Sequence, residues 1–224
     1  MSHGEPRVLD ARTDLGRDPG TILPGVLRHL RGGGVIGYPT ETVYGLGGVL
    51  TEGAVGRVRE LKSRDRSKPL IALVPSAESV SALRWTADAR ELARAFWPGP
   101  LTLVLEDPRG IFPAGVRDED THAVGVRVSP HPLVARLVAE LEGPLTSTSL
   151  NAPGQGPAMS GAEALDVVRG LGGHDVLLLD GGRLTPSKPS SVVDCTGPEP
   201  VILREGAVPT SRLRRAAPDI RPSA

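Results

Sequence analysis

The sequence predicts a single α/β domain. Short apolar runs of strand length alternate with longer segments of helical periodicity along the whole chain. A length of 224 residues suits one large domain with a substantial core, and the chain contains no internal repeat or low-complexity tract. Aromatic residues make up only 3% of the chain, so we expect a core built from Val, Leu, Ile and Ala.

The chain begins with a polar stretch. Residues 1–20 contain several Pro, Gly and Asp residues and predict a flexible lead-in, so we expect the domain itself over residues 21–209. Apolar residues about one helical turn apart predict a helix over 22–31, which a run of three glycines ends. The apolar run over 35–38 predicts a strand. The segment 39–47 is rich in turn formers and lacks periodicity.

Local signals define the elements that follow. Thr51 suits the N-cap of a helix over 52–62. A Pro-Gly-Pro tripeptide ends a helix over 88–97. The remaining elements of this half are a strand over 70–74, a helix over 76–83 and a strand over 101–106.

The second half opens with a polar loop over 107–121 and ends in a basic tail over 210–224, for which we expect a short helix and a frayed end. Ser160 and Glu163 fit a capping box that opens a helix reaching residue 171. The remaining elements are strands over 123–128, 145–150, 175–180, 191–194 and 201–204 and a helix over 132–141.

Composition and motifs argue against several functional classes. The 26 basic and 26 acidic residues cancel, so net charge gives no attraction to nucleic acid or acidic membranes. The apolar runs are too short to span a bilayer, and we expect no membrane partner. The single cysteine, Cys195, favours a cytoplasmic setting. The chain has no P-loop, no G-x-S-x-G motif and no metal-ligand spacing, so we expect no protein-held metal.

A basic cluster follows the helix predicted over 52–62. We expect the chain to leave this helix near Ser63, so the side chains of Lys62 and Arg64 can converge on one anion. Lys supplies a point charge and Arg a bidentate fork, which together suit a polyphosphate. The alternative is a solvated basic turn, which is the correct interpretation of most such tripeptides.

A polar cluster ends the strand predicted over 145–150. Alternation along a strand places Ser147, Ser149 and Asn151 on the same face, where they suit a ligand. The alternative is a strand that runs into an Asx-type turn. The residues alone leave these two interpretations about even.

Four further candidates each have a simple structural alternative. The hydroxyl of Ser190 can serve only to bond its own loop. Arg204 can form a surface salt bridge with the next residue, which contributes little, and Arg127 can end a strand at the surface. Thr40 lies in a segment whose glycines allow close approach to a ligand, but which can equally be a structural turn.

Seven segments of the chain carry a family resemblance. They are YPTETVYGLG (38–47), KSR with KPL (62–70), FWPGPLTLVL (96–105), VGVRV with HP (124–132), STSLN (147–151), SSVVD (190–194) and ILREGAV (202–208). Together they resemble the YrdC-like family of threonylcarbamoyl-adenylate synthases, in its short single-domain form. The family signature K-x-R…S-x-N corresponds here to Lys62, Arg64, Ser149 and Asn151.

The resemblance implies a twisted, mixed, open sheet flanked by helices around a deep concave ligand cavity. It also implies a reaction: the amine of threonine takes up bicarbonate, the resulting carbamate attacks the α-phosphate of ATP, and pyrophosphate leaves. Mg²⁺ is expected to accompany ATP. The product supplies the threonylcarbamoyl modification of tRNA, so tRNA and other proteins of that pathway are expected partners.

The family's residue roles can be carried over to matching positions. Many relatives have Ala where this chain has Leu150, and strand alternation predicts that Leu150 points away from the site. The resemblance assigns threonine binding to Thr40, Arg127 and Ser190, ATP binding to Lys62, Arg64, Ser147, Ser149, Asn151 and Arg204, and catalysis to Lys62 and Arg64.

Two alternative functions stay open. One is an RNA-binding module without catalysis, against which the scarcity of aromatic stacking residues argues mildly. The other is a carbamoyl-adenylating enzyme that acts on an amine other than threonine.

Overall fold

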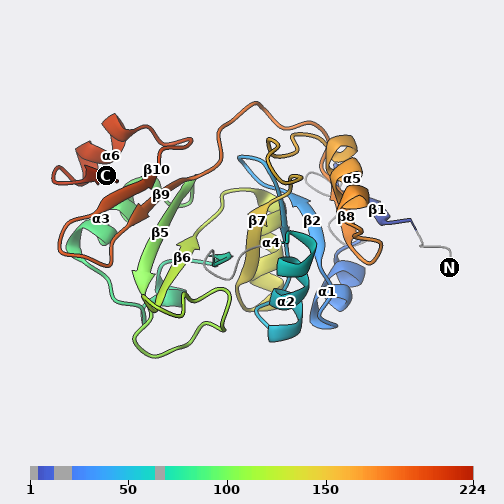
Figure 1. The fold of residues 1–224 in the computed structure, drawn as a ribbon, viewed down its shortest axis with the longest axis horizontal. Helices are drawn as coiled ribbons and strands as arrows, with labels where there is room; N and C mark the ends of the chain where they lie inside the picture. The colour runs from blue at the N-terminus through green and yellow to red at the C-terminus, as the bar shows by residue number, and fades with distance from the viewer. Residues whose placement is uncertain (1–4, 13–21, 64–68, 224) are drawn as a thin grey trace.

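A computed structural model describes residues 5–12, 22–63 and 69–223 of the chain. Helices flank a sheet in which all the described strands take part (Figure 1). The strands are β1 Arg7–Asp10, β2 Ile36–Pro39, β3 Tyr44–Gly47, β4 Ile71–Leu73, β5 Leu101–Glu106, β6 Ala123–Arg127, β7 Leu145–Ser149, β8 Leu177–Asp180, β9 Ser191–Asp194, β10 Val201–Arg204 and β11 Arg221–Pro222. The helices are α1 Leu23–Arg31, α2 Glu52–Leu61, α3 Ala87–Phe96, α4 Pro132–Leu141, α5 Gly161–Gly170 and α6 Thr210–Ala216.

The sheet is mixed, as the family resemblance implied. Its strand order is β1-β8-β2-β3-β7-β4-β6-β5-β9-β10-β11. The parallel pairs are β1/β8, β2/β8, β4/β6, β5/β9 and β10/β11, and the antiparallel pairs are β2/β3, β3/β7, β4/β7, β5/β6 and β9/β10. Strand β7 therefore lies near the middle, antiparallel to both of its neighbours.

Helices cover both faces of the sheet, so its central strands are buried on both sides. Strand alternation is visible in β8, where Leu177 and Leu179 face one apolar core and Leu178 faces the other. The apolar faces of α1 and α4 fill the first core, and those of α2, α3, α5 and α6 contribute to the second. None of the helices within the described residues combines the length and apolar character needed to cross a membrane.

Most of the elements predicted from periodicity are confirmed. The bounds of β5, β9, β10 and α4 coincide with those predicted, and α1, α2, α3, α5, β2, β4, β6, β7 and β8 differ by a few residues at most. The predicted N-cap is also present, since Thr51 Oγ1 accepts a hydrogen bond from Ala54 N at 3.4 Å. The basic tail forms a short helix, α6, as predicted.

The segment 39–47 was predicted as turns, and the structure corrects this in part because Tyr44–Gly47 forms β3. The glycines that suggested turns are there because neighbouring strands approach closely. A Cβ at Gly47 would lie 1.7 Å from the carbonyl oxygen of Thr146 on β7. A strand that must let its partner this close needs glycine, even though glycine disfavours strands in general.

The helix predicted over 76–83 is wrong, since only Glu78–Val80 is helical, as a single 3₁₀ turn. The Ser76 and Ser79 side chains bond the local backbone instead: Ser79 Oγ donates to Ser76 O at 2.7 Å, and Ser76 Oγ accepts from Ser79 N at 3.3 Å. Such local bonds compete with a continuous helix.

The predicted lead-in and the predicted C-terminal tail each contain a strand that the sequence patterns did not predict. Within the predicted lead-in 1–20, Arg7–Asp10 forms β1 and pairs with β8, while residues 1–4 and 13–20 lie outside the described residues. In the tail, Arg221–Pro222 forms β11 against β10. Both strands join through backbone hydrogen bonds and expose most of their side chains, so no apolar alternation marks them.

Ser160→Ala is expected to lower stability by about 1 kcal/mol, because Ser160 Oγ caps α5 by accepting from Glu163 N at 3.3 Å. For a chain of this size, that loss lowers the melting temperature by roughly 2–4 °C. Calorimetry on Ser160→Ala and on Ser211→Ala, an exposed serine of α6, checks the prediction. Equal melting temperatures for the two variants would contradict the capping role.

Candidate functional site

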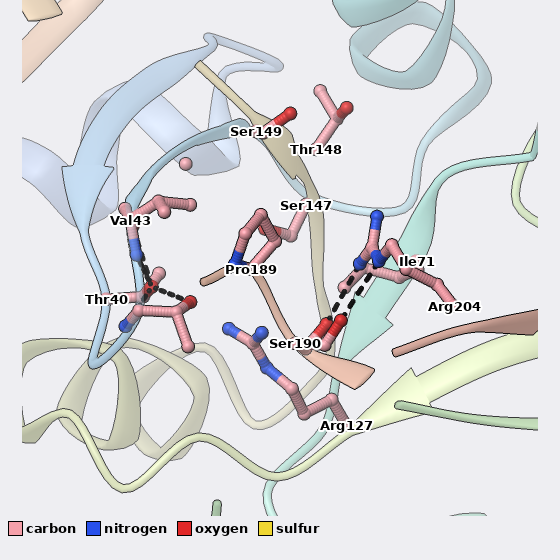
Figure 2. Close-up of a pocket in the computed structure, with 12 residues that line it drawn as sticks. Thr40, Val43, Ile71, Arg127, Ser147, Thr148, Ser149, Pro189, Ser190 and Arg204 are labelled. Atoms are coloured by element: carbon pink, nitrogen blue, oxygen red, sulfur yellow. Dashed lines mark hydrogen bonds between the residues drawn. The ribbon is translucent and has the colours of Figure 1, made fainter. Parts of the chain in front are cut away.

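A polar pocket of about 110 Å³ lies where the middle strands and the connection into β9 meet. Six of the nine predicted site residues line it: Thr40, Arg127, Ser147, Ser149, Ser190 and Arg204 (Figure 2). The other lining residues are Thr42, Val43, Gly45, Ile71, Thr148 and Pro189. The pocket therefore gathers residues that are up to 164 positions apart in the sequence, from Thr40 to Arg204.

Curvature of the sheet brings residues of distant strands together at the pocket. Five strand spacings separate β7 from β10 in the strand order, which in a flat sheet would put them roughly 24 Å apart. Residues of both strands nevertheless line the same small pocket. The sheet must therefore twist and curl around the pocket, as twisted sheets of right-handed strands do.

Strand β7 supplies one wall of the pocket. Ser147 pairs with Ile71 of β4, and Ser149 pairs with Gly45 of β3, so hydroxyls of β7 lie between two strands that also line the pocket. Thr148 lines it as well. Leu150 is fully buried in an apolar core, which confirms that it points away from the site.

Lys62, Ser149 and Asn151 form one connected group, which we call the lysine cluster. Lys62 Nζ donates to Asn151 Oδ1 at 2.9 Å and to Asn151 O at 2.6 Å. Ser149 Oγ donates to the same Oδ1 at 2.8 Å. The Asn151 side chain also donates to the carbonyls of Ala152 and Gln155, so it holds the loop after β7. The structure thus joins three residues of the predicted signature beside the pocket.

The fourth signature residue, Arg64, lies outside the described residues. The chain does leave its helix where expected: α2 ends at Leu61, and Ser63 has a left-handed φ of 44°. Whether Arg64 converges with Lys62 stays a prediction.

Arg204 and Ser190 form a second hydrogen-bonded group in the pocket lining (Figure 2). Arg204 Nε donates to Ser190 O at 3.0 Å, and its Nη2 donates to Ser190 Oγ at 3.3 Å. Thr102 Oγ1 lies 3.0 Å from the same hydroxyl. Partial burial of the guanidinium, together with the charge of Arg127, lowers the pKa of Arg204 from its ordinary value. The surface salt bridge considered for Arg204 is absent among the described ion pairs, because the neighbouring glutamate bonds Thr210.

Arg127 does not end its strand at the surface. Its side chain is only 4% exposed, and Nη2 lies 3.6 Å from Glu41 Oε1. Its guanidinium points into the space between Thr40 and Ser190 (Figure 2). A buried arginine without a tight carboxylate partner suits a ligand that brings its own negative charge.

Thr40 and Tyr44 shape the site mainly through the backbone. Thr40 Oγ1 donates to Val43 O at 2.7 Å and accepts from Thr42 N and Val43 N at 3.2 Å, which holds the turn between β2 and β3. Tyr44 is core-packed with a satisfied hydroxyl: it donates to Gly182 O at 2.7 Å and accepts from Gly181 N at 3.0 Å. Burial raises the Tyr44 pKa to about 12. Tyr44 thereby anchors the connection that carries Ser190.

The donor chemistry of the pocket does not fit a protein-held metal. Its lining offers hydroxyls and guanidinium groups but no carboxylate. Within the described ranges, no three His, Cys, Asp or Glu side chains gather closely enough to hold an ion. Mg²⁺ prefers carboxylate, phosphate and water oxygens, so the described residues alone do not form its site.

Sequence reasoning missed several residues of the pocket and its support. Thr42, Val43 and Gly45 belong to the 38–47 motif, but the sequence predicts no individual role for them. Ile71 lines the pocket because β4 pairs with β7, and strand pairing is not visible in one sequence. The signal for Glu41 was its place beside Thr40 in the same motif.

Comparisons with known proteins agree with this architecture. The Sua5/YciO/YrdC family model, described as telomere recombination, matches residues 28–206. A threonylcarbamoyl-AMP synthase of Chromohalobacter salexigens is 40% identical over 168 residues, which cover 74% of this chain and 88% of the relative. A threonylcarbamoyl-AMP synthase of Pyrococcus abyssi is 35% identical over 195 residues, which cover 86% of this chain and 56% of the relative.

A solved structure is similar over nearly the same extent. The crystal structure of P. abyssi Sua5 complexed with L-threonine matches with a TM-score of 0.82 at 32% identity, over 90% of this chain and 58% of that chain. This chain therefore spans little more than half the length of the Pyrococcus protein. The family model covers most of the sequence, including Arg127, Arg204 and the described signature residues, and the chain belongs to the Sua5/YciO/YrdC family.

Proposed function

We propose that this chain is an L-threonylcarbamoyladenylate synthase, which converts ATP, L-threonine and bicarbonate to threonylcarbamoyl-AMP and pyrophosphate. The observation that carries the proposal is the pocket itself: two guanidinium groups, those of Arg127 and Arg204, line a hydroxyl-rich hollow. The cation of Lys62 is joined to this lining through Asn151 and Ser149. The names of the relatives from Chromohalobacter and Pyrococcus support the same reaction.

We assign the amino acid to the side of the pocket that holds Thr40, Arg127 and Ser190. The Arg127 guanidinium suits the threonine carboxylate, because a planar fork matches two carboxylate oxygens. The small polar groups of Thr40 and Ser190 suit a hydroxyl-bearing side chain. The L-threonine complex of P. abyssi Sua5 supports threonine as the substrate.

We assign ATP to the lysine cluster together with Ser147 and Arg204 of the pocket lining. Arg64, which lies outside the described residues, is a further predicted ATP contact. The charges of Lys62 and Arg204 suit phosphate oxygens, and the short hydroxyls of β7 can donate to them. Arg204 also bonds Ser190, so it stands at the border between the two substrates, where the carbamate must meet the α-phosphate.

The reaction mainly requires that the two substrates be positioned and that the charge developing on phosphate be stabilised. A carbamate oxygen attacks the α-phosphorus, and the bond to the bridging oxygen of pyrophosphate breaks as pyrophosphate leaves. No nucleophile from the protein is required, and pre-placed cations stabilise the charge that develops on phosphate. A Mg²⁺ that accompanies ATP would be held by phosphate and water oxygens rather than by the described side chains.

The wider setting is also part of the proposal. The product would supply tRNA threonylcarbamoylation, with tRNA and other proteins of that pathway as partners. We place the chain in the cytoplasm, where its buried single cysteine, whose pKa burial raises to about 12, would stay a reduced and unreactive thiol.

The test is product analysis by mass spectrometry after incubation with ATP, bicarbonate and threonine. We expect threonylcarbamoyl-AMP, with pyrophosphate release that requires both threonine and bicarbonate. Pyrophosphate release that ignores threonine would contradict the proposal. A screen of other amino acids tests the alternative acceptor, and RNA binding that is salt-dependent but unaccompanied by ATP turnover would favour the RNA-binding module.

A further inference from the structure

Two polar side chains next to Arg127, those of Glu41 and Ser129, have no role in the assignments above. Together with the backbone N–H of His131 we call them the Glu41 cluster. Ser129 Oγ donates a 2.6 Å hydrogen bond to Glu41 Oε2 and accepts from the backbone N–H of His131 at 3.2 Å. The cluster therefore ties the turn between β2 and β3 to the segment after β6 through a single carboxylate.

The other oxygen of that carboxylate faces Arg127. Glu41 Oε1 lies 3.6 Å from Arg127 Nη2, which is close enough for charge attraction but too long for a hydrogen bond. Glu41 Oε1 and Arg127 Nε are both buried, and neither has a hydrogen-bond partner among the described residues. Buried polar atoms without hydrogen-bond partners cost free energy. A direct hydrogen bond between Glu41 and Arg127 would therefore make the folded protein more stable than the observed 3.6 Å contact does.

The charges around Arg127 explain why a carboxylate is needed there. The positive charge of Arg127 contributes to the lowered pKa of Arg204, so the two guanidinium groups are near enough to repel each other. The lining of the pocket contains no carboxylate. Glu41 supplies negative charge from just behind this lining, and its side chain is only 15% exposed, so water screens the attraction weakly.

We propose that Glu41, held by Ser129, is a positioning residue for Arg127: it fixes the guanidinium for an amino-acid carboxylate and offsets enough of its charge to keep other small anions out. The inference rests on the proposed function. A bidentate pair between Glu41 and Arg127 would occupy the fork that the substrate needs. The looser contact holds the guanidinium and leaves Nε without a protein partner.

The test uses the full chain with Glu41→Gln, which keeps the size of the side chain and an acceptor for Ser129 but removes the charge. Threonine binding by calorimetry is expected to weaken about tenfold, because the Glu41 charge no longer holds the Arg127 guanidinium in place, and this loss of positioning outweighs the stronger attraction for a carboxylate. Formate, a small carboxylate without an amine, is expected to compete with threonine in Glu41→Gln at concentrations that have little effect on the wild type. The KM for ATP is expected to stay unchanged.

Ser129→Ala provides a second variant that keeps both charges. It removes the 2.6 Å hydrogen bond, and we expect about threefold weaker threonine binding, since Glu41 is then held less firmly. If Glu41→Gln does not fold, this variant decides. Glu41→Asp keeps the charge on a shorter side chain and is expected to exclude formate better than Glu41→Gln.

Glu106→Gln is the matched control, because Glu106 is a partly buried glutamate paired with Arg84 at 2.7 Å away from the pocket lining. It should leave threonine and formate binding unchanged. The inference is overturned if Glu41→Gln and Ser129→Ala bind threonine as the wild type does, or if formate competes equally in all variants. If the wild type does not bind threonine, the proposed function fails, and direct formate binding to wild type and Glu41→Gln still tests the role of Glu41.

Discussion

Lys62→Ala is expected to lower kcat/KM for ATP by about 10²–10³-fold, the usual cost of removing one pre-placed group that stabilises charge in a transition state. Two effects combine. The variant removes a cation beside the phosphate side of the pocket, and it removes the donor that holds Asn151 Oδ1 at 2.9 Å. Pyrophosphate release at saturating threonine and bicarbonate measures the effect.

Arg57→Ala is the control for Lys62→Ala. Arg57 lies on the same helix, α2, but its guanidinium bonds Asp175 at 2.6 and 2.9 Å. Its loss removes a cation and an ion pair without touching the pocket, so kcat/KM for ATP should stay within about twofold of wild type. Unchanged ATP kinetics in Lys62→Ala would remove the lysine cluster from the ATP site.

Asn151→Ala separates the two effects of Lys62→Ala, because it keeps the lysine charge and the bond from Lys62 Nζ to the backbone carbonyl of residue 151 but removes the amide oxygen to which Lys62 and Ser149 both donate. A smaller loss than in Lys62→Ala would indicate that the charge contributes more than the hydrogen bonds do.

The parts of the fold that sequence patterns predicted are those in which side chains carry the signal. The helix α4 was predicted at its observed bounds because Leu133, Val134, Leu137 and Val138 form a continuous apolar face. The strand β3 was missed because its glycines reflect the approach of β7 rather than a local preference. The strand β1 was missed because most of its side chains are exposed and show no apolar alternation, so only its backbone pairing with β8 defines it.

The same distinction holds for the site. Alternation along β7 placed Leu150 away from the site, which the structure confirms. It did not predict the pocket lining as a whole, since Thr148 lines the pocket with Ser147 and Ser149, and Asn151 does not line it. The connection of Lys62 to Asn151 spans 89 positions. It forms because α2 packs against β3, which pairs with β7, and only the family resemblance indicated it in advance.

The sequence could not identify Glu41 and Ser129 as residues that support the site, for a related reason. Glu41 and Ser129 act through Arg127, and their bond joins two loops 88 positions apart. Glu41 lies beside Thr40 in the 38–47 motif, but nothing in the sequence indicates that it contacts Ser129 or Arg127. Their importance comes from burial and from the scarcity of negative charge around two guanidinium groups, and both of these are properties of the folded chain.

Arg127→Lys is expected to raise the KM for threonine by roughly 10–100-fold while the KM for ATP stays nearly constant. The variant keeps the positive charge but replaces a planar fork by a single ammonium, so one charge-assisted hydrogen bond of about 1.5–3 kcal/mol is lost. At about 1.4 kcal/mol per tenfold change, that loss gives the stated range. Steady-state kinetics with each substrate varied in turn measure it.

The control for this variant is Arg136→Lys, the same exchange at an exposed arginine of α4 that pairs with Glu140 at 2.7 Å. Because Arg136 lies on the surface, its kinetics should match those of the wild type. If Arg127→Lys also matched the wild type, a point charge would be enough at this position. The planar fork of Arg127 would then contribute nothing to threonine binding, and its positioning by Glu41 would have no effect on that binding.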